Sequence, residues 1–305
     1  MQAGEGIDPM NAARQWILAY DVGGSHATAG LVHQITVELQ SVRSRRIDSA
    51  VAADGILDAL AELGNDALAG QSQSVVSGIA MSMPGPFDYQ KGICYIRGLA
   101  KYEQLYGVDF RATMAERFPA VPAAAVRFIN DAAAALLGEI HAGAAKGAHR
   151  VIGLTLGTGI GSAFAVDGRI VTTGAGVPTE GYVYNQPFRD GVAEDFVSGR
   201  VIKKMYAQVS SRACEVKEIA QRAAHDAGAK MVFAQFGQML GEVLLPMVNG
   251  FLPDVIVLGG AVARSSSLFL PTTREALKGT SVELRPSSLH DSAGVIGAAV
   301  AWSQH

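Results

Sequence analysis

The sequence predicts two α/β domains with a cleft between them, and three observations lead to this fold class. The chain has 305 residues, more than one domain usually holds. Strand-like runs in hairpin groups alternate with helical patterns. An opening pattern of strand, glycine-rich turn and strand returns at residue 151. We expect a small domain at 16–129, completed by a C-terminal helix at 292–305, and a large domain at 130–291.

The first half of the chain opens with a predicted β-hairpin. An apolar run at 16–20 stops at Asp21 and two glycines, and β-forming residues resume at 27–38. Residues 50–69 repeat apolar side chains at three- and four-residue spacing, which indicates an amphipathic helix. The remaining elements expected here are strands at 75–82 and 125–131 and helices at 109–118 and 132–148.

The second half repeats the hairpin and is richer in helical patterns. Residues 151–174 read as three strands separated by a glycine-rich turn and an Asp-Gly turn. A buried-type strand within 254–265 runs into a Gly-Gly turn. Helices are expected at 192–208, 215–227, 229–250 and 292–305.

Composition argues against several classes of protein. A formal charge of −3 with interspersed signs offers no basic stripe for nucleic acid and no polybasic segment for a membrane. The first fifteen residues lack the pattern of a secretory signal, and no apolar run approaches a membrane span of about 20 residues. Cys94 and Cys214 form neither a disulfide framework nor a zinc motif. We therefore expect a cytoplasmic protein that binds neither nucleic acid nor membranes.

Glycine-rich turns after apolar strands are the main functional signal. Glycines let backbone N–H groups approach an anion closely, so several such turns together favour a phosphate-rich ligand, although hairpin geometry is the better explanation of any single turn. No P-loop, dinucleotide fingerprint or Gly-x-Ser-x-Gly elbow occurs, so Ser82 reads as an ordinary strand residue. The turns contain Gly23 and Gly24, Gly85, Gly157 to Gly161, and Gly259 and Gly260.

Asp131 is the most pointed catalytic candidate. A carboxylate in the first turn of a helix is stabilised as an anion by the helix dipole, and a positioned anionic carboxylate can act as a general base. Capping of the helix is an equally good explanation for Asp131. Asn130 also has two interpretations: its side chain binds sugar hydroxyls, or it is only the N-cap of the helix.

The motifs in their order resemble the ROK family of sugar kinases, within the actin/hexokinase-like ATPase superfamily. "DVGGSHATAGLV" resembles the first phosphate motif of the family, with Ser25 in place of threonine, and "SMPGPFD" resembles the sugar-side Pro-Gly turn. "INDAAAALLGE" is similar to the catalytic Asn-Asp motif. The second phosphate motif is matched by "LTLGTGIGSAFAVDGRIVTTGAGVPTEG", the adenosine motif by "VIVLGGAVA" and the C-terminal helix by "GVIGAA". The resemblance covers about residues 17–300 and implies an actin-like ATPase (ribonuclease H-like) fold.

The resemblance also implies a role for each matched residue. Asp131 would deprotonate the sugar hydroxyl that attacks the γ-phosphate of ATP, and Asp21 would position Mg²⁺ through water. The sugar would be bound by Pro84, Gly85, Asn130, Asp131, Glu180 and Glu194. ATP would be bound by Gly23, Gly24, Ser25, Thr158, Gly159, Gly259 and Gly260.

The chain departs from the family after Glu180-Gly181. Many members continue with a histidine and a cysteine-rich zinc motif, whereas here Tyr182 follows and "VYNQPFRDG" contains no cysteine. We therefore expect no zinc site, and sugar preference cannot be transferred from zinc-bearing relatives. Tyr182 or Tyr184 could fill part of the space, although packing of a shortened loop explains them better.

The resulting hypothesis is an ATP- and Mg²⁺-dependent hexose kinase, and the substrate we expect is glucose, which a glucokinase converts to glucose 6-phosphate. Kinases for mannose, fructose or an N-acetylated amino sugar, and a glucokinase that uses polyphosphate as well as ATP, are the alternatives within this class. A sugar-sensing protein without turnover is the alternative from another class, and a Rossmann-type oxidoreductase is a distant third. The resemblance also implies a possible homodimer.

Overall fold

A computed structural model describes residues 14–98 and 102–304 and divides into two compact units. Unit 1 runs to Gly138 and resumes at Asp291, and unit 2 is Glu139–His290. The first change of unit thus falls after Gly138 rather than at the expected boundary after residue 129. The start of the helix that follows Asn130 belongs to unit 1 because it packs closely on the C-terminal helix: a Cβ atom on Gly297 would overlap the carbonyl oxygen of Ala134.

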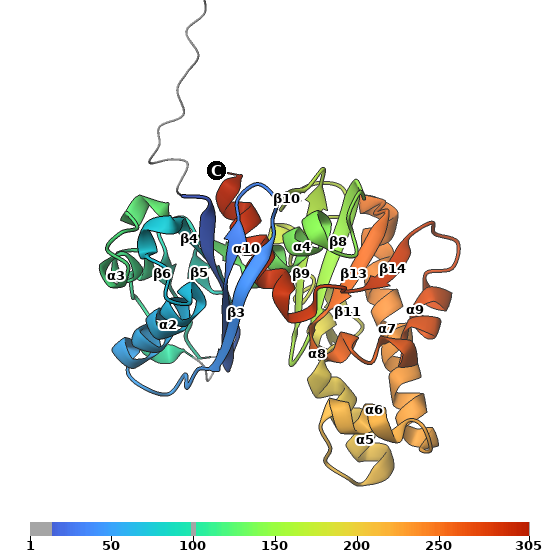
Figure 1. The fold of residues 1–305 in the computed structure, drawn as a ribbon. Helices are drawn as coiled ribbons and strands as arrows, with labels where there is room; N and C mark the ends of the chain where they lie inside the picture. Colours follow the sequence, from blue (N-terminus) through green and yellow to red (C-terminus); the bar gives the residue numbers. More distant parts are fainter. Residues whose placement is uncertain (1–13, 99–101, 305) are drawn as a thin grey trace, which may run out of the picture. The chain divides into compact units, whose positions relative to one another are not determined.

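Unit 1 is built on a five-stranded sheet in the order β3-β2-β1-β4-β7 (Figure 1). β1 pairs antiparallel with β2 and parallel with β4, and β4 pairs parallel with β7. The C-terminal ends of β1, β4 and β7 therefore lie at one edge of the sheet. The strands are β1 (Trp16–Val22), β2 (His26–His33), β3 (Leu39–Arg46), β4 (Val76–Met83) and β7 (Val126–Asn130), with a small hairpin of β5 (Phe87–Asp88) and β6 (Ile93–Cys94).

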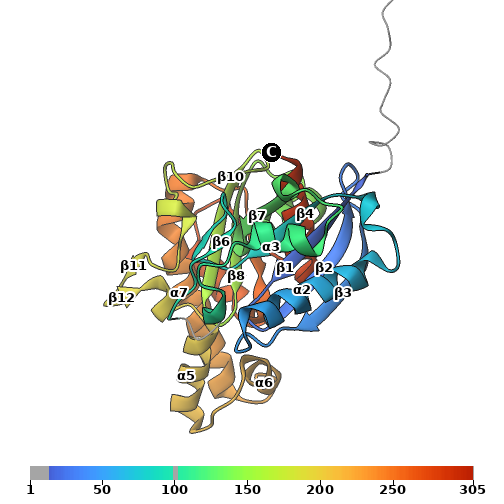
Figure 2. The ribbon, with the colours of Figure 1, turned by 90° about the vertical axis from the view of Figure 1, so that its left-hand side faces the viewer.

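Helices cover both faces of this sheet. α10 (Ala293–Ser303) packs on β1 and β4, where Val295, Ala298 and Ala299 join a buried cluster with the strands. On the other face, α2 (Ala53–Leu68) and α3 (Phe110–Arg117) enclose the larger core of the unit. Figure 2 shows α2 and α3 in front of the strands of the unit.

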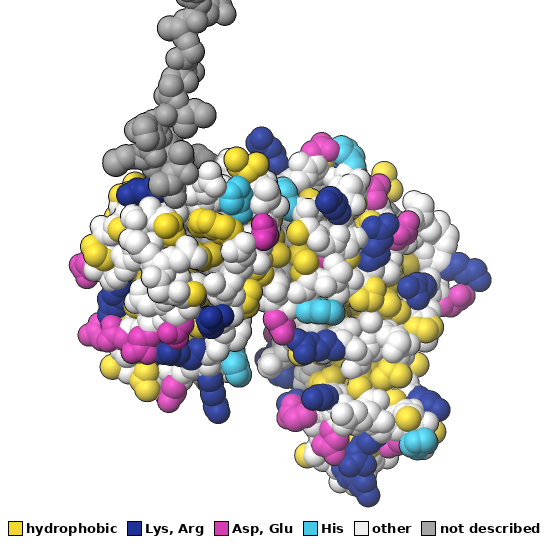
Figure 3. All heavy atoms as spheres, in the orientation of Figure 1, with side chains coloured by type: hydrophobic (Ala, Val, Ile, Leu, Met, Phe, Trp, Pro, Cys, Tyr) yellow, Lys and Arg dark blue, Asp and Glu magenta, His cyan; other side chains and the backbone are white. Residues whose placement is uncertain are grey.

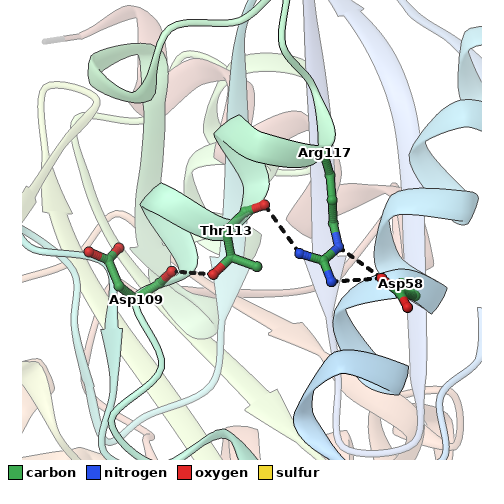
Figure 4. Close-up of polar contacts among 4 residues, drawn as sticks. All are labelled: Asp58, Asp109, Thr113 and Arg117. Atoms are coloured by element: carbon green, nitrogen blue, oxygen red, sulfur yellow. Dashed lines mark hydrogen bonds and ion pairs between the residues drawn. The ribbon is translucent and has the colours of Figure 1, made fainter.

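The two helices of the outer layer are joined by a polar contact (Figure 4). The Arg117 guanidinium donates two hydrogen bonds, at 2.6 and 3.0 Å, to one carboxylate oxygen of Asp58 on α2. Asp109 caps α3 by accepting a hydrogen bond from the backbone N–H of Ala112. Figure 3 shows acidic and basic side chains next to each other on the visible face of unit 1, rather than a patch of one sign.

Unit 2 repeats the sheet of unit 1, with the strand order β10-β9-β8-β13-β14. β8 pairs antiparallel with β9 and parallel with β13, as β1 does with β2 and β4. This correspondence confirms the internal repeat indicated by the glycine-rich hairpins. The strands are β8 (Arg150–Leu156), β9 (Ile160–Val166), β10 (Arg169–Val171), β13 (Val255–Gly259) and β14 (Glu283–Pro286), with a separate hairpin of β11 (Pro187–Phe188) and β12 (Gly191–Val192).

The core of unit 2 is formed mainly between its sheet and α7 (Ala227–Phe251). α7 is long and apolar enough to be a membrane span by length and composition, but 61% of its most apolar window is buried in the protein. Side chains such as Phe233, Phe236 and Leu240 are fully buried in the core of unit 2, so α7 is a core helix. α4 (Asp131–Ala142) runs from unit 1 into unit 2, and the other helices described in unit 2 are α5 (Gly199–Ser210), α6 (Val216–Arg222), α8 (Gly260–Ala263) and α9 (Leu270–Ala276).

A buried carboxylate lies where unit 2 begins. Glu139, only 2% exposed, is on α4 and accepts hydrogen bonds from the segment with which unit 2 ends. A buried carboxylate is tolerated when donors surround it. Its donors are the backbone N–H groups of Ala144, Ser288 and Leu289 and the hydroxyls of Ser287 and Ser288. Glu139 thus ties together the two ends of unit 2.

Candidate active site

In unit 1, the predicted acidic and amide side chains gather at the C-terminal ends of three parallel strands. Asp21 near the end of β1 is in register with Ser82 of β4, and Met83 of β4 is in register with Asn130 of β7. In open parallel sheets, ligands bind outside the carboxyl ends of the strands. The strand order therefore brings Asp21, Asn130 and Asp131 to the edge where a ligand is expected.

Asp21 is a strongly perturbed carboxylate. The Ser82 hydroxyl donates a hydrogen bond of 2.7 Å to its Oδ1 atom. Burial raises the pKa of Asp21 to about 6; the hydrogen bond from Ser82 opposes this rise, and the negative charges of Asp131 and Asp291 add to it. Residue 294 must be glycine, because a Cβ atom there would collide with the Asp21 carboxylate.

Asn130 and Asp131 form the N-terminus of α4. The Asn130 side-chain oxygen accepts hydrogen bonds from the N–H groups of Ala132 and Ala133, so Asn130 caps the helix as expected. Its amide nitrogen donates to Tyr89 Oη at 3.2 Å and to Asp131 Oδ1 at 3.0 Å. Asp131 Oδ1 also accepts from the N–H of Ala132, and these donors stabilise negative charge on the carboxylate.

The Pro84-Gly85 turn follows β4 and lies next to the Asn-Asp pair. Tyr89 joins the two features, because its hydroxyl donates to the Met83 carbonyl at 3.2 Å and accepts from Asn130. A Cβ atom on Gly85 would lie 3.4 Å from the same hydroxyl. Tyr89 therefore fixes the amide of Asn130 relative to the Pro-Gly turn.

Gly23, Gly24 and Ser25 form the exposed turn between β1 and β2. The turn is closed by a hydrogen bond from the Gly23 N–H to the His26 carbonyl at 2.9 Å. The hydroxyl of Tyr102, which lies 79 residues further along the chain, donates a hydrogen bond to the Gly23 carbonyl at 2.6 Å. Tyr102 is buried, which raises its pKa to about 12, so it remains a donor at physiological pH. Tyr102 holds the carbonyl side of the turn in place.

In unit 2, the second glycine-rich turn and the Gly-Gly motif lie at the ends of β8 and β13. The Gly199 N–H at the start of α5 donates to the Gly157 carbonyl at 2.8 Å, and Thr158 is exposed at the tip of the turn. Gly259 of β13 is in register with Thr155 of β8. Gly260 has a φ of +84°, and a Cβ atom on it would lie 2.5 Å from the Leu156 carbonyl oxygen, so only glycine fits.

Glu180 lies in a short 3-10 turn (Thr179–Gly181) with a left-handed backbone, φ 55°. Its side chain is exposed, while its neighbours are fixed by the buried Ser162 of β9. The Ser162 hydroxyl donates to the Gly181 carbonyl at 2.7 Å and accepts from the Val183 N–H at 2.8 Å. The turn therefore presents Glu180 from a rigid base.

Glu194 lies in the 3-10 turn before α5, and its carboxylate has hydrogen-bond partners within unit 2. Its Oε2 atom accepts a hydrogen bond from the Ile160 N–H at 3.0 Å, and its Oε1 atom pairs with the Arg200 guanidinium at 2.5 Å. Both carboxylate oxygens therefore contact the glycine-rich turn or its neighbours, which the resemblance did not lead us to expect.

The segment in place of the cysteine-rich motif is a hairpin held by aromatic side chains. Phe188 of β11 packs edge-to-face on Phe196 at 5.2 Å between ring centroids, and the Arg189 guanidinium lies over both rings. Tyr182 and Tyr184 pack against each other at 5.5 Å. This contact agrees with the interpretation preferred from the sequence, in which Tyr182 and Tyr184 pack the shortened loop.

Asp21 suits Mg²⁺ held jointly with phosphate groups. Within residues 14–98 and 102–304, no group of three His, Cys, Asp or Glu side chains could form a metal cage. Mg²⁺ commonly keeps several waters and takes one or two carboxylates plus substrate phosphates. Asp21 is a buried carboxylate near two further acids, Asp131 and Asp291, so a nearby cation would stabilise its ionised form. Asp21 therefore fits a Mg²⁺ ion that is bound by one carboxylate, waters and substrate phosphates.

Three residues that support the site were missed from the sequence. Ser82, interpreted as an ordinary strand residue, is the hydrogen-bond donor to Asp21. Tyr89 and Tyr102 bind Asn130 and Gly23 from 41 and 79 residues away along the chain. A serine in register with an acid at adjacent strand ends was a usable signal for Ser82, whereas the tyrosines carry no local motif.

Comparison with known proteins relates this chain to a family. The model described as "ROK family" matches residues 17–305. A glucokinase from Thermotoga maritima is 24% identical, over 93% of this chain and 96% of its own length. The crystal structure of a ROK hexokinase from Thermus thermophilus has a TM-score of 0.73 and 25% identity, covering 93% of this chain and 97% of that one.

A ROK family glucokinase from Streptomyces griseus, solved in complex with glucose and AMPPNP, superposes with a TM-score of 0.76 at 22% identity. The match covers 95% of this chain and all of that one. These likenesses confirm the actin-like ATPase fold class expected from the sequence.

Proposed function

This chain belongs to the ROK family, and we propose that it is an ATP-dependent sugar kinase that phosphorylates a hexose, with glucose as the expected substrate and glucose 6-phosphate as the product. The observation that carries the proposal is the placement of Asp131. It lies at the N-terminus of α4, beside Asn130 and near Asp21, at the carboxyl edge of the unit 1 sheet. The names of the glucokinase and hexokinase relatives support the same activity.

In the proposed reaction, Asp131 accepts the proton of the attacking sugar hydroxyl. The sugar oxygen forms a bond to the γ-phosphorus as the bond between that phosphorus and the β,γ-bridging oxygen breaks, and ADP leaves. The hydrogen bonds from Asn130 and the Ala132 N–H hold the Asp131 carboxylate in place for this transfer. A Mg²⁺ ion held through Asp21 would neutralise phosphate charge in the transition state.

The other site residues receive binding roles in this proposal. Asn130 and Glu180 would bind sugar hydroxyls, beside the Pro84-Gly85 turn. The backbone N–H groups of the two glycine-rich turns would bind phosphate oxygens, since such turns make anion-binding nests. The turn residues assigned to the nucleotide are Gly23, Gly24, Ser25, Thr158, Gly159, Gly259 and Gly260. A cytoplasmic location, where ATP is available, completes the proposal.

ADP release measured across a panel of sugars tests the proposal. The panel contains glucose, mannose, fructose and N-acetylated amino sugars, each with ATP and with polyphosphate as donor. Because an acetamido pocket and a free 2-hydroxyl make different hydrogen-bonding demands, the panel also identifies the substrate. Turnover of glucose with ATP is expected, whereas sugar binding without any turnover would support the sugar-sensing alternative.

Asp131→Asn tests the role of the base. Loss of a positioned general base lowers kcat by about 10²- to 10⁴-fold, while calorimetry should still detect sugar binding. Asp226→Asn is a matched control, because Asp226 is also a helix cap, accepting hydrogen bonds from the N–H groups of Gly228 and Ala229 at the start of α7. Full activity of Asp131→Asn would refute the assignment of the base.

A further inference from the structure

Tyr89 lies in the turn between β5 and β6, and its hydroxyl belongs to a chain of hydrogen bonds that ends at Asp131. The hydroxyl donates to the Met83 carbonyl at 3.2 Å, so its oxygen faces Asn130 as an acceptor and receives the side-chain amide N–H at 3.2 Å. The same amide nitrogen donates to Asp131 Oδ1 at 3.0 Å. Tyr89 is thus two hydrogen bonds away from the carboxylate that we propose as the base.

These hydrogen bonds give the Asn130 amide a single orientation. Its oxygen accepts the backbone N–H groups of Ala132 and Ala133, and its nitrogen has an acceptor for each of its two hydrogens. A flip of the amide would set its oxygen against the Asp131 carboxylate and its nitrogen against two N–H groups, which would cost all of these bonds. The Tyr89 hydroxyl therefore helps to keep the amide nitrogen directed at Asp131.

The turn that carries Tyr89 is closed by hydrogen bonds on both sides of this residue. Asp88 Oδ1 accepts hydrogen bonds from the backbone N–H groups of Gln90 at 3.1 Å and Lys91 at 2.9 Å. The Asp88 carbonyl accepts a further hydrogen bond from the Gly92 N–H at 2.7 Å. An aspartate that binds the backbone two residues on stabilises a turn, so the backbone at Tyr89 is fixed.

The same turn packs on β7, the strand that ends at Asn130. Gly92 has a φ of +81°, and a Cβ atom on it would lie 2.6 Å from the ring of Phe128, so the backbone of the turn approaches this ring closely. The Arg111 guanidinium lies over the same ring, 6.0 Å from its centroid, and donates to the Gln90 carbonyl at 2.5 Å. Phe128 and Asn130 are two residues apart on a strand, so their side chains project from the same face. The contacts with Phe128 therefore fix the turn relative to Asn130.

We infer that Tyr89 is a positioning residue for phosphoryl transfer, which acts through the Asn130 amide to hold the Asp131 carboxylate in the orientation that accepts the sugar proton. The inference rests on the proposed function, because it takes Asp131 to be the base. A general base is effective when it is within hydrogen-bond reach of the proton in a fixed geometry. Loss of the Tyr89 hydroxyl should therefore slow turnover of the sugar and leave nucleotide binding unchanged.

Tyr89→Phe tests the inference, because it removes the hydroxyl and keeps the ring, which packs on Phe87 at 5.3 Å between centroids. We expect kcat/KM for the hexose to fall about fivefold, as for the loss of one neutral hydrogen bond. The affinity for Mg²⁺-AMPPNP, measured by calorimetry without sugar, should stay within about twofold of wild type. Tyr106→Phe is the matched control: Tyr106 is half exposed in the same unit and contacts Tyr95 through its ring, so this variant should change neither value.

A double-mutant cycle separates an action through Asn130 from a general structural role. Asn130→Ser keeps an oxygen that can cap α4 but removes the amide, so Tyr89→Phe should have no further effect on kcat/KM in this background. NMR spectroscopy gives a readout that does not need turnover. The side-chain amide signals of Asn130, identified by their loss in Asn130→Ser, should shift in Tyr89→Phe and stay in place in Tyr106→Phe.

Three outcomes would overturn the inference. The first is a kcat/KM in Tyr89→Phe equal to that of wild type. The second is a fivefold loss that persists in the Asn130→Ser background, because Tyr89 would then act on the sugar or on the fold. The third is an unchanged set of Asn130 amide signals in Tyr89→Phe, which decides the question where Asn130→Ser is too slow to assay. Failure of the proposed function is distinguishable: wild type would turn over no hexose, while the amide signals would still report whether Tyr89 holds Asn130.

Discussion

Replacing Asp21 with asparagine tests the electrostatics of the unit 1 site. Burial and the nearby acids raise the pKa of Asp21 from its ordinary 3.8 to about 6 in the folded protein. A shift of one pKa unit corresponds to about 1.4 kcal/mol. Ionising Asp21 therefore costs up to about 3 kcal/mol more in the folded protein than in the unfolded chain. This is the size of the effect that the variant should remove.

The sign follows from proton binding. Between about pH 4 and 6 the folded state holds more protons at Asp21 than the unfolded state, so stability falls as the pH rises. Above the folded pKa, the whole cost of the buried anion is present. Asp21→Asn does not ionise, and its free energy of unfolding relative to wild type should therefore increase by up to about 3 kcal/mol from pH 4 to 7.5.

Urea unfolding followed by tryptophan fluorescence measures this difference. The chain has two tryptophans, Trp16 and Trp302, and both belong to unit 1, so the signal reports on the unit that contains Asp21. Asp88→Asn is the control: its backbone hydrogen bonds lower the pKa of Asp88, so the effect of this variant should be constant from pH 5 to 8.

A difference between Asp21→Asn and wild type that stays constant or decreases as the pH rises would refute the reasoning. Ser82→Ala provides a second check on the same carboxylate. Because the Ser82 hydroxyl lowers the pKa of Asp21, its removal should move the pH-dependent loss of stability to higher pH.

Three further substitutions probe the supports around the site. Tyr102→Phe removes the hydrogen bond to the Gly23 carbonyl, worth about 1 kcal/mol, and should weaken AMPPNP binding several-fold in calorimetry; unchanged binding would contradict this role. Glu139→Ala leaves buried donors without an acceptor and should lower the free energy of unfolding in urea by about 3 kcal/mol, while a change under about 1 kcal/mol would show that solvent replaces the carboxylate. Gly297→Ala forces a Cβ atom into the Ala134 carbonyl and should cost about 2 kcal/mol or more in the same titration, and wild-type stability would mean that α10 moves freely.

The elements that the sequence predicts well are those whose burial imposes a pattern. β1, which carries Asp21 near its end, and β13, which ends at Gly259, lie where expected, because a strand buried in a sheet needs a continuous apolar run. The capping role of Asn130 was also predictable, since it depends on the next three residues only.

Edge elements escaped prediction because little of their surface is buried. The second strand expected at 27–38 ends at His33, and a third strand, Leu39–Arg46, follows with mostly exposed polar side chains. Likewise, the helix expected from 192 begins only at Gly199, because residues 193–195 form a separate 3-10 turn that carries Glu194. The contact of Glu194 with Ile160 spans 34 residues, and no local pattern encodes such a contact.

The order of the units along the chain has a consequence for biosynthesis. Unit 2 is one continuous segment inserted into unit 1, and it begins and ends at the segments joined by Glu139. Unit 1 needs α10 to cover the face of its sheet formed by residues such as Ile17 and Ala80. On the ribosome, unit 2 can therefore fold as soon as it has emerged, whereas the sheet that carries Asp21 and Asp131 waits with one apolar face bare until residues 293–303 are made.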